Sequence, residues 1–446
     1  MTREPAPVSR PVVLTVAGSD SGGGAGIQAD LKTIEACGGF GTSAVTSVTA
    51  QNTTGVESTH VLPVSEIDAQ VGAVRSDFDV RAVKTGMLAT ADVVELVTGR
   101  VAAIDAPAVV DPVMVAASGD RLLASAAESA YEDLLREATL VTPNVDEAAV
   151  LTDVDPDDES TARRAGEALV AMGADAALVK GGHVAGEQVA DVLVTGDSVE
   201  TFRHPRVDTD ATHGSGCTLS AAIATHLAEG ASVSDAVAAG IDLLGRAVRY
   251  NHDVGEGPGA VHHLVELRDA AAREATAEAV QSVVDAFVER DVAPLVPEAG
   301  TDVVGATPYA ERPDEVAAVD GRVIRTLSGA KPAGGVRFDA STRVAGTVLA
   351  AREADATVRF GANVRDDAVA ALEALDGAVT TVDSDDASTA ETDAVAAAVA
   401  EADGPPAAVV EGSSGGENAH VTLLAPDPET LVARTTALLD AVEPAD

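Results

Sequence analysis

The 446-residue sequence predicts an α/β fold, in which a parallel sheet is covered by helices on both faces and a smaller α/β domain follows. Short buried-strand runs alternate with helix-like stretches through the first half of the chain, a pattern typical of parallel sheets. Each apolar run ends in polar or glycine residues, where such sheets place their ligand loops. The length also favours two domains or more.

The first strand is expected over residues 12–17, and a glycine-rich loop over 18–26 follows it. Ile27, Leu31 and Ile34 then recur at helical spacing, so the order is strand, glycine loop, helix. The loop lacks the Gly-Lys-[Ser/Thr] ending of a Walker A phosphate loop. Taken alone, it is weak evidence for a ligand.

Three further strand-and-turn units are expected at 109–114, 140–144 and 177–183. Because the carboxyl ends of parallel strands meet at one edge of the sheet, their polar residues would face one crevice. These residues are Asp111, Asn144, Glu147 and Lys180.

The segment 208–220 is the most informative stretch of the chain. Gly214 and Gly216 flank Ser215, and an Ala-rich helix begins there. Bare backbone N–H groups and the helix dipole at such a start favour an anion. Cys217 stands at the helix entrance, where the same field would lower the pKa of its thiol. The arrangement suits phosphoryl transfer, and a plain helix start with a buried cysteine is the alternative.

Together these blocks resemble the ThiD-type kinases of thiamine biosynthesis. The resemblance implies a ribokinase-like, three-layer α/β/α kinase domain over residues 1–265. It also implies ATP-dependent phosphorylation of 4-amino-5-hydroxymethyl-2-methylpyrimidine and then of its monophosphate to the diphosphate. A pyridoxal-type kinase of the same fold is the alternative. The matching stretches, in the family's order, are 17–20, 24–32, 49–53, 84–88, 111–114, 142–148, 180–183, 212–220 and 257–263.

The resemblance also implies a pyrimidine pocket. Asp30 and Gln51 could hydrogen-bond the aminopyrimidine edge, and Met87 could pack softly against the ring. The residues implied to line the pocket are Gly18, Asp30, Gln51, Met87 and Val113.

On the phosphate side, the resemblance implies that Gly214, Ser215 and Gly216 cradle the transferring group. Cys217 stands where sugar kinases of this fold carry an aspartate base, so positioning and charge would matter more than proton removal. Lys180 would neutralise phosphate charge. The implied Mg-ATP residues are Asn144, Glu147, Lys180 and Thr212, with Asp111 and Glu147 as candidate Mg²⁺ ligands. For Asp111, turn chemistry before a proline is the alternative.

A domain boundary is expected near residues 265–295. Apolar residues keep helical spacing over 275–289, and Pro294 and Pro297 then break it. We therefore expect a linker helix over 266–292 and a second domain over 293–446. Its expected strands include 303–304, 358–360 and 409–410, and its expected helices are 343–353, 367–375 and 430–442.

Residues 322–365 form a cationic island, with eight Lys or Arg and three Asp or Glu, net +5 in a chain of −43. Such an island predicts a phosphate or pyrophosphate ligand, because Arg binds phosphate oxygens bidentately. Internal ion pairing is the alternative, and nucleic acid is not expected because the flanking acidic residues would repel it. The candidate anion-site residues are Arg322, Lys331, Arg337, Arg343 and Arg365.

The segment 290–446 resembles the ThiN-type domain. This resemblance implies a thiamine-phosphate synthase that joins the pyrimidine diphosphate to thiazole phosphate. Arg343 stands where active members usually carry a histidine, and His420 is another candidate ligand contact. A non-catalytic module that binds thiazole phosphate or thiamine phosphate is therefore the alternative. The resembling stretches are 296–301, 319–322, 337–341 and 362–365.

Composition adds the cellular setting. A net charge of −43 with 2% aromatic residues is typical of proteins adapted to molar salt, so a halophilic archaeal source is expected. A hydrophobic content of 46% argues against disorder. No signal peptide and no apolar run of about 20 residues is visible, so we expect a cytoplasmic protein. The two cysteines suggest no disulfide framework, and the kinase resemblance implies a homodimer.

Overall fold

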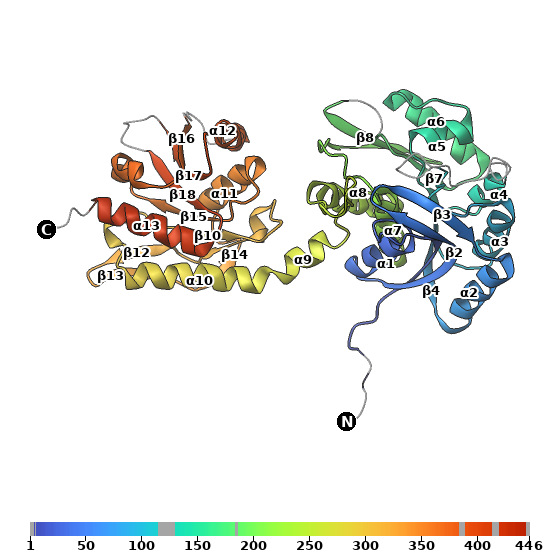
Figure 1. Ribbon diagram of the computed structural model, residues 1–446, viewed down its shortest axis with the longest axis horizontal. Coiled ribbons are helices and arrows are strands. Elements are labelled where there is room, and N and C mark those ends of the chain that lie inside the picture. Colours follow the sequence, from blue (N-terminus) through green and yellow to red (C-terminus); the bar gives the residue numbers. More distant parts are fainter. Residues whose placement is uncertain are drawn as a thin grey trace. The chain divides into compact units, whose positions relative to one another are not determined.

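In a computed structural model the described residues are 4, 6–114, 130–182, 186–382, 389–412 and 419–442. The chain divides into two compact units, Met1–Glu266 and Leu267–Asp446, here called unit one and unit two (Figure 1). Each unit contains one main sheet with its own hydrophobic core.

Within the described part of unit one, nine strands form a sheet with the order β3-β2-β1-β4-β5-β6-β7-β8-β9. Six adjacent strands pair in parallel, as predicted: β2, β1, β4, β5, β6 and β7. In contrast, β3, β8 and β9 add antiparallel edges that the sequence did not indicate. The strands are β1 Val12–Ser19, β2 Phe40–Asn52, β3 Gly55–Val61, β4 Val80–Thr85, β5 Ala108–Val110, β6 Leu140–Val141, β7 Ala176–Val179, β8 Gln188–Thr195 and β9 Val199–Pro205.

Helices cover both faces of this sheet (Figure 1). Alternate residues of β1 enter different cores, because Val13 packs with one helical layer while Leu14 and Val16 pack with the other. The predicted three-layer α/β/α fold is thus confirmed. One layer consists of α1 Gly26–Ala36, α7 Ser215–Ala228 and α8 Val233–Arg249. The other consists of α2 Val64–Asp77, α3 Ala91–Val101, α4 Tyr131–Leu135, α5 Val145–Thr152 and α6 Glu159–Met172.

The direction of winding reverses at β1, which pairs with β2 on one side and β4 on the other. Open α/β sheets bind ligands beyond the carboxyl ends of their strands at such a point. The loop 20–25 follows β1 there, and residues 86–90 follow β4. This edge of the sheet is therefore where the site is expected.

Unit two contains a seven-stranded sheet among its described residues, with the order β14-β11-β10-β15-β18-β17-β16. Its pairs are antiparallel except for β16 with β17. A separate hairpin pairs β12 with β13. The strands are β10 Val303–Ala306, β11 Val316–Val319, β12 Val323–Thr326, β13 Gly329–Pro332, β14 Val336–Phe338, β15 Phe360–Val364, β16 Ala378–Val382, β17 Pro406–Glu411 and β18 His420–Ala425.

Two helical layers enclose the main sheet of unit two. One holds α10 Arg273–Glu289, the 3₁₀ helices η2 Ala293–Leu295 and η4 Asp366–Ala374, and α13 Pro428–Val442. The other holds α11 Arg343–Ala354 and α12 Thr389–Ala400. Also present are α9 Val265–Ala271 and the 3₁₀ helix η3 Pro313–Glu315.

The predicted linker helix over 266–292 is wrong in its role. Val283 and Phe287 of α10 are buried in the core of unit two with Val303 and Phe360, so this helix is part of the second unit. Apolar spacing predicted the helix but could not show which surface would cover its apolar face.

Two predicted elements differ in detail. The helix expected over 367–375 is a 3₁₀ helix, and the strand expected over 358–360 begins at Phe360. Val358 is buried, yet its N–H donates to the carbonyl oxygen of Asp355 in a turn. A short apolar run does not distinguish a buried turn from a strand.

Candidate functional site

The start of α7 lies against the glycine-rich loop that follows β1. Gly214 is its N-cap in the left-handed conformation, with φ of 86°, and no side chain among the described residues caps the helix. A Cβ atom at this position would lie 1.8 Å from the carbonyl oxygen of Gly24, so only glycine permits this approach. The uncapped N–H groups at this start can bind an anion.

A buried ion pair lies beside this helix start. Lys180 Nζ is 3.2 Å from Asp111 Oδ1, and their side chains are 15% and 3% exposed. A Cβ atom on Gly216 would lie 3.4 Å from Lys180 Nζ and 3.5 Å from Asp111 Oδ2. Burial would lower the pKa of Lys180, but the charges of Asp111 and Glu147 raise it overall, so the ammonium stays charged. The fold thus brings three predicted site residues together.

Asn144 and Glu147 form a capping box at the start of α5. The Asn144 N–H donates to Glu147 Oε2, and the Glu147 N–H donates to Asn144 Oδ1, each at 2.8 Å. A bridge between Asn144 and Lys180 holds this corner beside the ion pair. Burial raises the pKa of Glu147 to about 7, which Lys180 partly opposes and Asp111 reinforces. Glu147 therefore changes its charge near neutral pH.

The predicted low pKa of the Cys217 thiol is wrong. Burial raises this pKa to about 11, since desolvation outweighs the attraction of Lys84. The negative charges of Asp30 and Asp111 also raise it. With a pKa of about 11, the thiol is protonated at neutral pH.

The side chain of Asp30 is fully buried, which argues against its predicted contact with the pyrimidine. Its side chain has no exposed area, and both of its oxygens lie 2.9 Å from Lys84 Nζ. Thr15 Oγ1 also donates to Asp30 Oδ2 at 2.6 Å. Asp30 and Lys84 therefore form a fully buried pair, and Lys84 received no role in the sequence analysis.

The other residues predicted to line the pyrimidine pocket lie at the carboxyl ends of the strands. Gly18 and Met87 are neighbours, because a Cβ on Gly18 would lie 3.2 Å from Met87 Cε and 2.7 Å from Ser47 Oγ. Val113 is half-buried after β5, and its N–H donates to the Asp111 carbonyl oxygen at 2.8 Å. Gln51 is half-buried near the end of β2.

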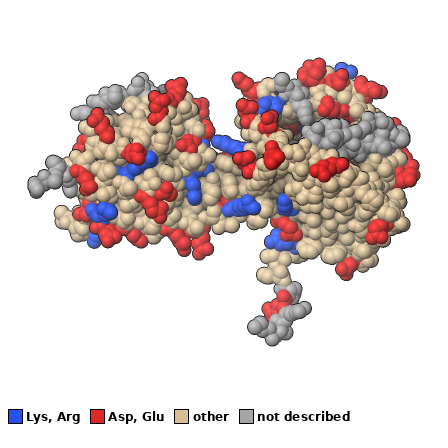
Figure 2. Space-filling model, viewed as in Figure 1, with Lys and Arg blue, Asp and Glu red and all other residues tan. Residues whose placement is uncertain are grey.

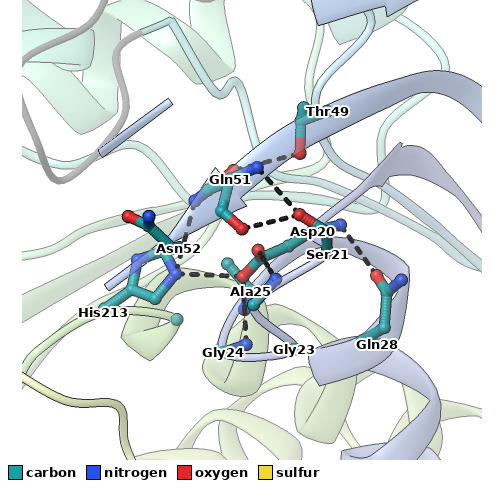
Figure 3. A network of polar contacts seen from close by, with 12 residues as sticks. Asp20, Ser21, Gly23, Gly24, Ala25, Gln28, Thr49, Gln51, Asn52 and His213 are labelled. Carbon is teal, nitrogen blue, oxygen red and sulfur yellow. Dashed lines mark hydrogen bonds and ion pairs between the residues drawn. The ribbon is translucent and has the colours of Figure 1, made fainter. Parts of the chain in front are cut away.

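Sequence reasoning missed the pair formed by Asp20 and His213. Asp20 is 2% exposed, and its carboxylate accepts N–H groups of the following glycine loop (Figure 3). His213 Nε2 lies 3.0 Å from Asp20 Oδ2 and 3.4 Å from Gln51 Nε2. An aspartate inside a glycine loop and a histidine directly before Gly214 were the available signals.

Thr212 is exposed in the loop before α7, where its carbonyl oxygen accepts the Ser215 N–H at 3.1 Å. His183, part of one motif block, lies outside the described residues. Asp111 and Glu147 offer two carboxylates, although no cluster of three or more metal-ligating side chains occurs in the described part of the chain. Over the same residues, no helix has the length and apolarity to cross a membrane.

Most candidate residues of the cationic island in unit two form ion pairs with acidic residues, which corrects the expectation from the charge count. Four of its five candidates have acidic partners outside the 322–365 segment, and Lys331 is exposed on β13. The pairs are Arg322 with Asp302, Arg337 with Asp320, Arg343 with Glu411 and Arg365 with Asp367. Two other members of the island turn inward. Arg352 donates to four carbonyl groups, and Arg359 donates to the carbonyl of Ala306.

Figure 2 shows acidic side chains over the visible surface of both units, with fewer Lys and Arg among them. The pairing of the island arginines is thus consistent with the composition of the chain as a whole.

Comparisons with known proteins agree with the division of the chain into two units. Residues 20–262 match the family described as phosphomethylpyrimidine kinase, and residues 279–437 match thiamine-phosphate synthase ThiN. A hydroxymethylpyrimidine/phosphomethylpyrimidine kinase of Streptomyces coelicolor is 52% identical over 264 residues, which are 59% of this chain and 98% of that protein. The thiamine biosynthesis bifunctional protein ThiED of Geobacter sulfurreducens is 43% identical over 270 residues, covering 60% of this chain and 55% of that protein.

Among solved structures, a pyridoxal kinase from Staphylococcus aureus in complex with ADP has a TM-score of 0.56 at 30% sequence identity. The match covers 58% of this chain and 96% of that one. The geometry at the start of α7 and the family match over more than half of the residues lead to one assignment: the chain belongs to the phosphomethylpyrimidine kinase family of phosphotransferases and carries a ThiN region behind its kinase unit.

Proposed function

We propose that unit one transfers the γ-phosphoryl group of ATP to the hydroxyl of 4-amino-5-hydroxymethyl-2-methylpyrimidine, and then phosphorylates the monophosphate to the diphosphate. The observation that carries this proposal is the uncapped start of α7 with Lys180 beside Gly216. Backbone amides and a desolvated ammonium together stabilise the charge that develops on a transferring phosphoryl group.

The pyrimidine ring would lie against Gly18, Met87 and Val113, with the amide of Gln51 reading its polar edge. Met87 is 8% exposed, and its thioether would pack against the ring. Asp30 would act behind the pocket by holding Lys84, and would not contact the substrate.

The phosphate groups would lie on the amides of Gly214, Ser215 and Gly216. The substrate hydroxyl oxygen would form the new bond to phosphorus as the bond to the β-phosphate oxygen of ADP breaks, and the hydroxyl proton would pass to an oxygen of the transferred phosphoryl group and then to solvent. Because the Cys217 thiol is protonated at neutral pH, it does not take the hydroxyl proton as a thiolate. Charge stabilisation by Lys180 and correct positioning are then the main contributions of this chain.

The nucleotide would lie near Asn144 and Glu147, with Thr212 at its phosphate end. Mg²⁺ prefers one or two carboxylates together with phosphate oxygens, and Asp111 and Glu147 meet that description. When bound, the ion would supply neutralisation of charge on the phosphates.

For unit two we propose that it joins the pyrimidine diphosphate to thiazole phosphate, giving thiamine phosphate. The ThiN match supports this activity, and Arg322 and Arg343 would meet the leaving pyrophosphate. One observation favours the alternative, a module that binds thiazole phosphate or thiamine phosphate without turnover. Arg343 faces the buried carboxylate of Glu411 at 3.8 Å and cannot supply the proton chemistry of a histidine.

One incubation tests both proposals. The full chain is mixed in molar KCl with the hydroxymethylpyrimidine, Mg-ATP and thiazole phosphate, and products are identified by mass. Pyrimidine diphosphate without thiamine phosphate supports the kinase and makes unit two a binding module. Thiamine phosphate supports both activities. If neither phosphorylated pyrimidine forms, the kinase proposal is wrong.

The substrate class needs its own test, because structural relatives include pyridoxal kinases. We expect kcat/KM for the hydroxymethylpyrimidine to exceed that for pyridoxal. A higher value for pyridoxal would overturn the proposed substrate. Exchanging Arg343→His then tests unit two, since a gain of thiamine phosphate would identify Arg343 as the block to synthesis.

A further inference from the structure

Two loops that are distant in sequence lie against each other in unit one. The glycine-rich loop 20–25 follows β1, and the loop 213–216 begins α7. Between them, His213 Nε2 lies 3.0 Å from Asp20 Oδ2; His263, which belongs to neither loop, places its Nε2 3.1 Å from the carbonyl oxygen of Gly24. These contacts span 193 and 239 residues of sequence, so only the tertiary fold creates them.

Asp20 organises its own loop. Its Oδ1 accepts the N–H of Gly22 at 2.7 Å, and its Oδ2 accepts those of Gly24 at 3.0 Å and Ala25 at 2.7 Å. His213 approaches the same Oδ2 atom. Burial would raise the pKa of Asp20, but the hydrogen bonds from His213, Ala25 and Gly22 lower it overall. An ionised carboxylate only accepts hydrogen bonds, so His213 donates through Nε2–H.

The end of β2 joins the same network (Figure 3). The Gln51 N–H donates to Ser21 Oγ at 2.8 Å, and the Ser21 hydroxyl donates to the Gln51 carbonyl oxygen at 2.6 Å. The Gln51 amide also lies beside the imidazole of His213. His213 therefore ties the glycine-rich loop to the start of α7, and the strand end that carries Gln51 is tied to the same loop through Ser21.

We propose that His213 is a positioning residue for phosphoryl transfer, which acts through Asp20 to hold the loop at the pyrimidine pocket at a fixed distance from the loop that binds the phosphoryl group. The proposal rests on the proposed kinase function and adds to it a residue outside the predicted site.

The physical reason is the steep cost of misplacement. Phosphoryl transfer depends on the alignment of the attacking oxygen with the phosphorus, and a shift of about 1 Å can cost about 100-fold in rate. Gly214 and Gly24 are already in contact through their backbones, so a few atoms determine the distance between the two loops. Loss of the imidazole leaves the Asp20 carboxylate with loop amides alone and lets the loops separate.

Two substitutions in the full chain test this role. His213→Ala removes the donor, and we expect kcat to fall about 30- to 100-fold while KM for the pyrimidine and for ATP each change less than about threefold. His213→Gln replaces Nε2 with an amide donor of similar reach, and we expect it to recover kcat to within about fivefold of wild type. His226→Ala is the matched control, because His226 lies on α7 and pairs with Glu229 at the surface.

The double variant His213→Ala with Asp20→Asn tests whether the loss of kcat comes from the contact between His213 and Asp20. We expect it to lose little more kcat than Asp20→Asn alone, because both changes break one interaction. Full additivity of the two losses would overturn the proposal.

The other outcomes are equally decisive. A raised KM for the pyrimidine at unchanged kcat would show that His213 serves recognition through Gln51. Failure of His213→Gln to recover activity, with thermal unfolding as in wild type, would show that the imidazole itself is needed. A loss of kcat matched by an equal loss of folded protein would show a structural role. If the wild-type chain itself phosphorylates no pyrimidine, the proposed kinase function is refuted. This outcome is distinct from failure of the His213 proposal, because all the other outcomes are measured against an active wild-type chain.

Discussion

The two helix starts, at α7 in unit one and α11 in unit two, offer the same elements in different arrangements. Each helix begins without a side-chain cap among the described residues, and each has a cation close by. At α7, Lys180 is 15% exposed and lies beside Gly216, which has no side chain to cover the ammonium. At α11, the first residue is Arg343 itself, 45% exposed and directed to buried Glu411.

Local charge and a free helix start therefore do not by themselves predict a phosphate site. At α7, a Cβ atom on Gly216 would lie 3.4 Å from Lys180 Nζ, so the glycine keeps the backbone close to the ammonium. An anionic ligand would compete with Asp111 for Lys180 at α7, and with Glu411 for Arg343 at α11, so the two starts differ in the glycines and in the burial of the cation. Four experiments test this contrast, and the one with the largest expected effect comes first.

The first prediction disturbs the close backbone contact at the start of α7. Gly214→Ala places a Cβ 1.8 Å from the Gly24 carbonyl oxygen at a φ of 86°, so the two loops must separate. We expect kcat to fall by about 100-fold or more. Gly245→Ala is the control, since a Cβ atom on this helical glycine of α8 would meet no described neighbour within 4 Å. It should keep activity and gain up to about 1 kcal/mol of stability. Equal activity of both variants would contradict the site.

The second prediction concerns the cation at α7. Lys180→Met should lower kcat about 100-fold and, by leaving buried Asp111 unpaired, cost about 3–5 kcal/mol of stability. Adding Asp111→Asn should recover most of the stability, because the buried charge is removed. Urea unfolding and steady-state kinetics of the two variants separate these effects. If the double variant also recovered activity, Lys180 would be structural.

The third prediction uses Glu147, whose pKa is raised from 4.5 to about 7. The folded state holds a proton that the unfolded state has released between these values, so this residue lowers stability as pH rises from 4.5 through 7. The full difference is on the order of 3 kcal/mol. Glu147→Gln keeps the hydrogen-bond acceptor and should remove this slope. The free energy of unfolding of both proteins across about pH 4.5–8 measures it, and parallel curves would contradict the prediction.

The fourth prediction concerns the pair at α11. Arg343→Ala leaves Glu411 bonded to Thr347 and should destabilise unit two by about 1–2 kcal/mol, less than a buried pair because Arg343 is half exposed. Hydrogen exchange of β17 and α11 peptides in the full chain reports the change. Addition of Glu411→Gln should reverse it, and Arg325→Ala on the exposed hairpin is the control. Unchanged exchange in Arg343→Ala would mean that the pair contributes little.

Much of unit one was predictable, because its signals are local. The strand, glycine loop and helix at 12–36, the helix from Ser215 and the parallel core of the sheet all follow from apolar spacing and glycine placement. Asp111, Asn144, Glu147 and Lys180 were predicted to face one crevice because carboxyl ends of parallel strands share one edge.

The errors have a common origin in burial and in partners distant in sequence. Burial raises the pKa of the Cys217 thiol, whereas the helix start was expected to lower it. Asp30 is hydrogen-bonded to Lys84, which is 54 residues away in sequence. The charge count over 322–365 omitted Asp302 and Glu411, which lie outside that segment.

The sequence by itself determined the family, the two-part division of the chain and the residues that meet at the start of α7, because periodicity, glycine placement and motif order are properties of the linear chain. Tertiary structure alone decided which charges are neutralised, which thiol is protonated and that His213 meets Asp20. These properties depend on desolvation and on distances of a few ångström between segments up to about 200 residues apart, and no local pattern encodes either.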